Sequence, residues 1–120
     1  MNLHESAEMY LETIYILSLK SNSVRSIDIA DAMGYSKPSV SRAVGLLKED
    51  GYLTAAENGC LILTEKGVKT AKGVFERHNV LTEFLIKIGV SEENAAADAC
   101  KIEHIISEET VNAVKKFLKQ

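Results

Sequence analysis

The chain has 120 residues, of which 46% are apolar and 26% charged, so it can bury a core and is neither fibrous nor compositionally disordered. Its 14 basic and 17 acidic residues leave a formal net charge of −3, so any DNA-binding surface must come from local clustering of basic side chains. The sequence contains no run of about 18 apolar residues, which is the length that a membrane-spanning helix needs. The first residues carry no secretion signal, so we expect a cytoplasmic protein whose Cys60 and Cys100 are reduced.

Helical spacing of apolar residues dominates the first part of the chain. It predicts a helix over residues 5–19 and a second over 26–33, capped by Ser26. A third helix is predicted between Ser36, its cap, and Gly51. One face of this third helix carries apolar side chains at i, i+3, i+4 and i+7 spacing, namely Val40, Ala43, Val44 and Leu47.

The pattern then changes to short, strand-like runs. Residues 52–55 and 60–63 flank Asn58-Gly59, a dipeptide that strongly favours a tight hairpin. Two capped helices joined by Gly34-Tyr35 and followed by a hairpin are typical of a winged helix-turn-helix.

Three further helices follow the hairpin. They are predicted from Thr64 to Gly89, from Ser91 to about Ile106, and from Ser107 onward. The expected fold class is therefore mainly α, with an N-terminal winged helix-turn-helix followed by a helical region.

The third helix is the predicted DNA-reading element, because the second helix of such a motif enters the major groove with its N-terminal residues at the bases. The face opposite its apolar stripe contains no acidic residue before Glu49. The alternative is the solvated face of an ordinary helix pair, but the hairpin and the acid-free face favour DNA. The predicted DNA-binding residues are Arg25, Ser36, Lys37, Pro38, Ser39, Ser41 and Arg42.

A second cluster of chemically distinctive residues occurs late in the chain. Cys100, Glu103 and His104 stand at i, i+3 and i+4, so on a helix they share one face. A thiolate, a carboxylate and an imidazole are three good metal ligands. The alternative is a buried cysteine beside a surface Glu-His pair.

Two segments carry a resemblance to a known family. Residues 8–15, Glu-Met-Tyr-Leu-Glu-Thr-Ile-Tyr, and residues 100–104, Cys-Lys-Ile-Glu-His, resemble the diphtheria toxin repressor family of metal-dependent transcriptional repressors, and the likeness covers nearly the whole chain. It implies that the winged helix binds DNA, that the later helices form a homodimer and that divalent Fe(II) or Mn(II) activates binding. It also implies that Met9 joins Cys100, Glu103 and His104 in the principal metal site.

The chain departs from the iron branch of this family at a second metal site. That site usually contains a histidine, a glutamate four residues later, and a histidine four residues before the cysteine. His78 is present, but Thr82 and Ala96 occupy the other two places. The iron-type second site is therefore not expected to be intact.

The short chain looks more like the manganese transport regulator branch, yet Met9 and Cys100 stand where that branch uses carboxylates. Glu12 matches a manganese-branch ligand, whereas the sulfur ligands favour Fe(II) or a softer late metal over Mn(II). We expect a second, weaker metal position formed by Glu12 and His78 with Glu103 shared. In the competing interpretation, His78 only donates a hydrogen bond to Glu12 or orients a ligand.

These features predict a metal-responsive repressor that binds a palindromic operator in double-stranded DNA as a homodimer. Residues 1–70 would be the DNA-binding domain and residues 71–120 the metal-binding and dimerisation region. An enzyme is not expected, because no nucleophile-base set, phosphate loop or zinc-protease motif is present. The alternatives are a winged-helix regulator that senses thiol oxidation through Cys100, and a metal-buffering or interaction protein that does not bind DNA.

Overall fold

The computed structural model describes the backbone of residues 3–120 and the side chains from Ser6 onward. It divides into two compact units, Met1–Lys72 and Gly73–Gln120. Helix α4 (Glu65–Lys87) begins in the first unit and continues into the second. Among the described residues, no helix has the length and apolar character needed to cross a membrane.

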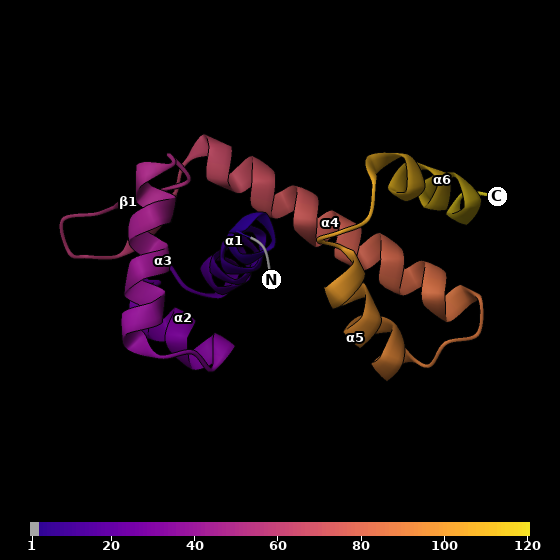
Figure 1. Ribbon diagram of the computed structural model, residues 1–120, viewed down its shortest axis with the longest axis horizontal. Coiled ribbons are helices and arrows are strands. Elements are labelled where there is room, and N and C mark those ends of the chain that lie inside the picture. The colour runs from indigo at the N-terminus through magenta and orange to yellow at the C-terminus, as the bar shows by residue number, and fades with distance from the viewer. Residues whose placement is uncertain (1–2) are drawn as a thin grey trace. The chain divides into compact units, whose positions relative to one another are not determined.

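The first unit is a winged helix-turn-helix, as predicted (Figure 1). Its elements are α1 (Leu3–Lys20), α2 (Ser26–Met33), α3 (Lys37–Glu49), β1 (Leu53–Ala55), β2 (Leu61–Leu63) and the first turns of α4. Helices α2 and α3 pack on each other and on α1, while β1 and β2 pair antiparallel with Leu53 opposite Leu63. The mainly α fold class is therefore confirmed.

The apolar stripe predicted on the third helix forms part of the core of this unit. Val40, Val44 and Leu47 are buried and Ala43 is partly buried. They pack in one cluster with Leu11 of α1 and Ile29 of α2, among others. The opposite face of α3 is thereby left toward solvent, where it is available for contacts with another molecule.

Most helices start at the N-cap that the sequence predicted, but one prediction is corrected. Ser36 caps α3, since its hydroxyl accepts a hydrogen bond from the Ser39 amide at 3.3 Å. The prediction that Ser26 caps the second helix is wrong: Ser26 is the first helical residue and Arg25 is the N-cap. The reason is Asp28, whose carboxylate accepts the Arg25 amide at 2.8 Å and satisfies this helix end instead.

The start of α4 is held tightly against the end of α3. The Thr64 hydroxyl donates to the Gly51 carbonyl at 2.6 Å and accepts the Gly67 amide at 3.1 Å. The Lys66 ammonium donates to the Asp50 carbonyl at 2.8 Å. Gly67 itself is buried, and a Cβ atom at this position would overlap the carbonyl oxygen of Tyr52.

This close approach yields a stability prediction. Gly67→Ala should lower the free energy of unfolding, because a main-chain carbonyl cannot turn aside as a flexible side chain can. Gly45→Ala is the matched control: Gly45 lies within α3 with open space around its Cα, so alanine should raise stability by about 0.5–1 kcal/mol. Urea unfolding followed by circular dichroism measures both, and equal stabilisation by the two alanines would contradict the tight junction.

The second unit consists of the rest of α4 with α5 (Glu92–Ile102) and α6 (Glu108–Leu118). Phe84 of α4 and Phe117 of α6 meet edge to face with ring centroids 5.5 Å apart. Lys115 of α6 pairs with Glu76 of α4 at 2.6 Å. Helix α6 is thus fixed to α4 by an aromatic contact and by an ion pair.

The fifth helix is shorter than predicted. It ends at Ile102 rather than near Ile106, and residues 103–105 form a turn. The amides of Ile105 and Ile106 both bond to the Ile102 carbonyl, each at 3.0 Å, so the helical ladder stops there. Ser107 then caps α6 by accepting the Thr110 amide.

Candidate metal centre and DNA-reading surface

Glu103 is the centre of a cluster of titratable side chains in the second unit. This carboxylate is 1% exposed, although it lies at the C-terminal end of α5. The Nδ1 atom of His78 lies 2.9 Å from Oε2 of Glu103, and the Nε2 atom of His104 lies 3.3 Å from Oε1. Each carboxylate oxygen therefore faces one imidazole nitrogen.

Helix α4 and the turn after α5 supply this cluster. His78 comes from the middle of α4, where the Thr82 hydroxyl one turn later donates to its carbonyl at 2.7 Å. Glu103 comes directly after α5 as its C-cap, with its amide bonded to the Ala99 carbonyl at 2.9 Å, and His104 follows in the same turn. The His104 side chain is 5% exposed, so the carboxylate and this imidazole are both withdrawn from water.

The donor set fits a divalent transition metal. A buried carboxylate is costly unless it is paired or coordinates a cation. Imidazole and carboxylate groups together suit first-row divalent ions such as Mn(II) and Fe(II). The Glu103 carboxylate with the His78 and His104 imidazoles therefore offers oxygen and nitrogen donors of the kind that such an ion takes.

The other predicted ligands have mixed placements. Cys100 is on α5 and exposed, unlike the buried Glu103 one turn later. Met9 and Glu12 are half-buried on α1, one turn apart in the first unit. The structure thus brings His78, Glu103 and His104 together, while the roles of Met9, Glu12 and Cys100 as ligands stay predictions.

One neighbour of the cluster was not singled out by the sequence. The Nε atom of Arg77 donates to the main-chain carbonyl of Glu103 at 2.8 Å. Its position directly before His78 on α4 was the available signal, but a basic residue beside a histidine on a helix is too common to be specific.

The predicted DNA-binding residues gather at the start of α3. Lys37, Pro38, Ser41 and Arg42 are exposed, as is the cap Ser36, and Ser39 is half-buried. The Ser36 hydroxyl donates to Ser39 Oγ at 2.9 Å, and Arg42 Nη2 approaches the same atom at 3.5 Å. Arg25 is exposed at the start of α2, with its guanidinium against Gly59 of the hairpin turn. The basic groups therefore lie on exposed positions of the helix-turn-helix and beside the hairpin.

Tyr10 of α1 is buried in the core of the first unit, where it contacts the turn between α2 and α3. Its ring centroid is 6.0 Å from that of Tyr35. Burial raises the pKa of the Tyr10 phenol, the nearby Tyr35 adds to the rise and Arg42 opposes it. The phenol is therefore neutral at pH 7, and Tyr10 contributes packing rather than charge to the α1–α3 contact.

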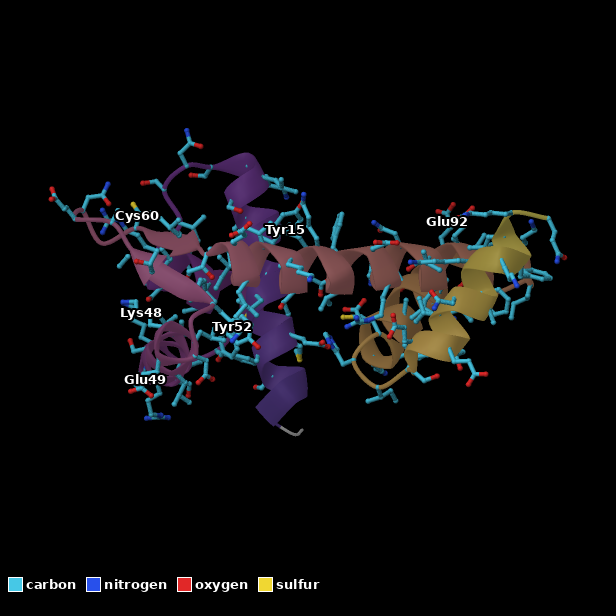
Figure 2. The ribbon with its side chains drawn as sticks, turned by 90° about the horizontal axis from the view of Figure 1, so that it is seen from above. Tyr15, Lys48, Glu49, Tyr52, Cys60 and Glu92 are labelled. Atoms are coloured by element: carbon cyan, nitrogen blue, oxygen red, sulfur yellow. The ribbon has the colours of Figure 1, made fainter. Side chains whose placement is uncertain are left out.

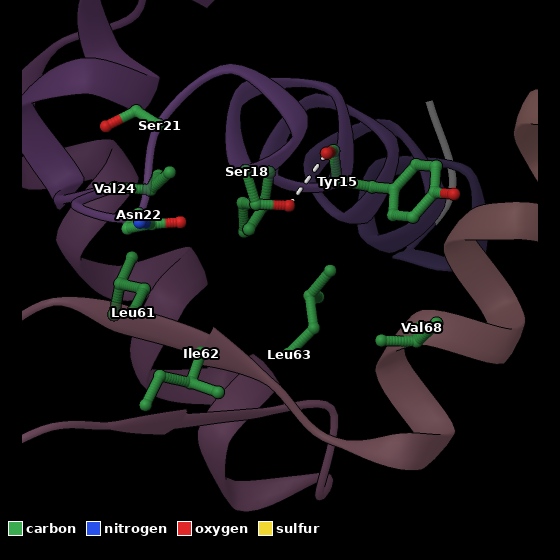
Figure 3. A pocket seen from close by; sticks show the side chains of 10 residues that line it. Tyr15, Ser18, Ser21, Asn22, Val24, Leu61, Ile62, Leu63 and Val68 are labelled. Carbon is green, nitrogen blue, oxygen red and sulfur yellow. Dashed lines mark hydrogen bonds between the residues drawn. The ribbon is translucent and has the colours of Figure 1, made fainter.

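A pocket of about 300 Å³ opens elsewhere in the first unit (Figure 3). It is lined mostly by apolar side chains, including Leu61, Leu63 and Val68, and by Tyr15 and Ser18, whose hydroxyl donates to the Tyr15 carbonyl at 2.8 Å. It contains none of the predicted metal-binding or DNA-binding residues.

Cys60 lies just before β2, rather than within the strand (Figure 2). It is buried, with its sulfur 3.2 Å from the Ser23 hydroxyl. Neither Cys60 nor Cys100, both within the described residues, forms a disulfide.

Comparison with known proteins accounts for both halves of the chain. Residues 2–61 match the family model of the iron-dependent repressor N-terminal DNA-binding domain. Residues 64–120 match that of the iron-dependent repressor metal-binding and dimerisation domain.

Individual relatives agree with the family models. The chain is 39% identical over 109 residues to the HTH-type transcriptional regulator MntR of Geobacillus kaustophilus, covering 91% of this chain and 77% of that protein. It is 36% identical over 117 residues to the iron-dependent repressor IdeR of Mycobacterium tuberculosis, covering 97% and 51%. The solved structure of the manganese regulator SloR superposes with a TM-score of 0.83 at 28% identity, covering 94% of this chain and 53% of that one. The chain thus spans about half the length of IdeR and SloR, and it belongs to the family of iron-dependent repressors.

Proposed function

We propose that this chain is a metal-dependent transcriptional repressor that binds a palindromic operator as a homodimer when Fe(II) or Mn(II) is available. The observation that carries the proposal is the buried Glu103 carboxylate between two imidazoles, on a chain that matches both domains of the repressor family. Residues 1–70 would bind DNA, and residues 71–120 would bind metal and form the dimer. As a regulator of transcription of this family, the protein would act in the cytoplasm.

The metal-binding residues follow from the donor chemistry and from the family resemblance. Glu103 and His104, with Met9 and Cys100, would hold the principal ion. Glu12 and His78, with Glu103 shared, would hold a second ion. Bound divalent metal supplies positive charge that favours approach to a polyanion. Since the similar proteins include a manganese regulator and an iron-dependent repressor, the two sulfur ligands decide our preference for Fe(II) or a softer metal over Mn(II).

The proposal is tested by selecting operators from a randomised DNA duplex library. The full chain is incubated with Mn(II), with anaerobic Fe(II) or with EDTA, and bound DNA is sequenced. We expect a palindromic sequence to be enriched with metal and not with EDTA. Enrichment that is independent of metal but lost on peroxide treatment would instead support a thiol sensor, and metal binding without any enrichment would support a metal-buffering protein.

The second unit should mediate dimer formation. Large apolar side chains are exposed on it, namely Ile86, Ile88, Ile105 and Phe117. Covering them against a second copy removes apolar surface from water, and two-fold symmetry is the commonest solution for homo-oligomers. Sedimentation velocity should therefore show a dimer at high micromolar concentration. A monomer that persists there with and without Mn(II) would contradict this prediction.

The stoichiometry of metal binding distinguishes the two roles of His78. If His78 is a ligand to a second ion, titration calorimetry with Mn(II) should give two ions per subunit for the parent and one for His78→Ala. Its contact with Glu103 at 2.9 Å is also compatible with an orienting role. One ion per subunit in both proteins would leave only the orienting role.

A further inference from the structure

The peptide bond between Glu103 and His104 joins two of the residues that face each other in the cluster. Its carbonyl oxygen accepts a hydrogen bond from Arg77 Nε at 2.8 Å. Because a peptide group is planar, holding this oxygen also sets the direction in which the chain enters His104. One hydrogen bond therefore constrains the backbone from which both the carboxylate and the imidazole project.

The backbone conformation of Glu103 and His104 is not imposed by regular helix geometry. Helix α5 ends at Ile102, and the amides of Ile105 and Ile106 both return to the Ile102 carbonyl, so Glu103 and His104 stand in a turn. A basic side chain at a helix C-terminus is favourable because it bonds a terminal carbonyl and faces the negative end of the helix dipole. Arg77, half-buried on α4, supplies such a partner from a neighbouring element.

The side chain of Glu103 is held by His78, the residue after Arg77 on α4. His78 Nδ1 lies 2.9 Å from its Oε2 atom. Two consecutive residues of α4 thus contact Glu103, one at its main chain and one at its carboxylate. We propose that Arg77 is a positioning residue of the metal centre, which binds no metal itself and prepares Glu103 and His104 as ligands by fixing the peptide group between them.

This inference rests on the proposed function, because it assumes that Glu103 and His104 bind metal. Residues that orient a ligand through a hydrogen bond typically contribute about 10- to 100-fold to metal affinity. We expect an effect of that size from loss of the Arg77 donor, without loss of the fold.

A matched pair of variants isolates the donor. In Arg77→Gln, the amide nitrogen stands the same number of bonds from the main chain as Nε of arginine, so it can donate to the Glu103 carbonyl. In Arg77→Met, a methyl group takes that place. Both variants lose the positive charge and both keep a good helix former. Mn(II) affinity is measured by calorimetry, the ligand environment by the visible spectrum of the Co(II)-loaded protein, and the apo fold by circular dichroism.

Arg77→Met is expected to bind Mn(II) about 10- to 100-fold more weakly, with an altered Co(II) spectrum, while Arg77→Gln stays close to the parent. Equal losses in both variants would overturn the inference in favour of charge or bulk, and parental affinity in both would overturn it outright. Arg77→Leu, which also lacks the donor, replaces the methionine variant if that chain loses helicity. Failure of the parent itself to bind metal would instead overturn the proposed function.

Discussion

Glu103→Gln should abolish metal-activated DNA binding while leaving the apo chain helical. Glutamine keeps the size of the side chain and an oxygen that can accept a hydrogen bond, but it removes the negative charge that makes Glu103 a strong ligand. Since this carboxylate contacts both His78 and His104, its loss affects every member of the cluster. The loss of Mn(II) affinity should exceed the roughly 10- to 100-fold effect of residues that only orient a ligand.

Glu83→Gln provides the control for this substitution. Glu83 is exposed on α4, so the same chemical change there should leave metal binding near the parental value. His104→Ala should resemble Glu103→Gln in gel shifts with Mn(II). Unchanged metal activation in Glu103→Gln and His104→Ala would remove the sensor assignment.

Local patterns in the sequence predicted most of the first unit. The stripe through Val40, Val44 and Leu47 is buried as expected, because apolar period alone decides which face of a short amphipathic helix meets the core. The Ser36 cap and the hairpin around Asn58-Gly59 are also confirmed, since each depends on a few adjacent residues. Local competition explains the failure at Ser26, where the carboxylate of Asp28 satisfies the helix end.

The metal cluster could be predicted only in part. The spacing of Cys100, Glu103 and His104 predicted one shared helix face, but α5 ends at Ile102, so Glu103 is buried in the turn while Cys100 is exposed on the helix. The apolar residues that follow suggested a longer helix, whereas Ile105 is 70% exposed in the turn. The contact of His78 with Glu103 joins residues 25 positions apart, and no local pattern encodes it. That pairing was expected from the family resemblance, whereas Arg77 was missed because its partner is a main-chain carbonyl, which no residue type in the sequence indicates.

The second large effect is expected at the start of α3. Arg42→Ala should cost about 1–3 kcal/mol of discrimination between the selected operator and a variant base pair, because a guanidinium can donate two hydrogen bonds to guanine in the major groove. Lys37→Ala should weaken binding to all sequences alike and lower the salt slope by about one, as expected for a phosphate contact. Both side chains are exposed and project away from the buried stripe, so neither substitution should change stability.

Lys48→Ala is the matched control, because Lys48 is exposed in the last turn of the same helix and its loss changes the net charge equally. Fluorescence anisotropy with the selected operator, repeated over a range of salt concentrations with saturating Mn(II), separates the three variants. Only the N-terminal residues of a recognition helix meet the base edges, so Lys48→Ala should leave base discrimination unchanged. If Lys48→Ala reduced discrimination as much as Arg42→Ala, net charge rather than base contact would explain the effect. If Arg42→Ala and Lys37→Ala both bound the operator normally, α3 would not be the helix that reads DNA.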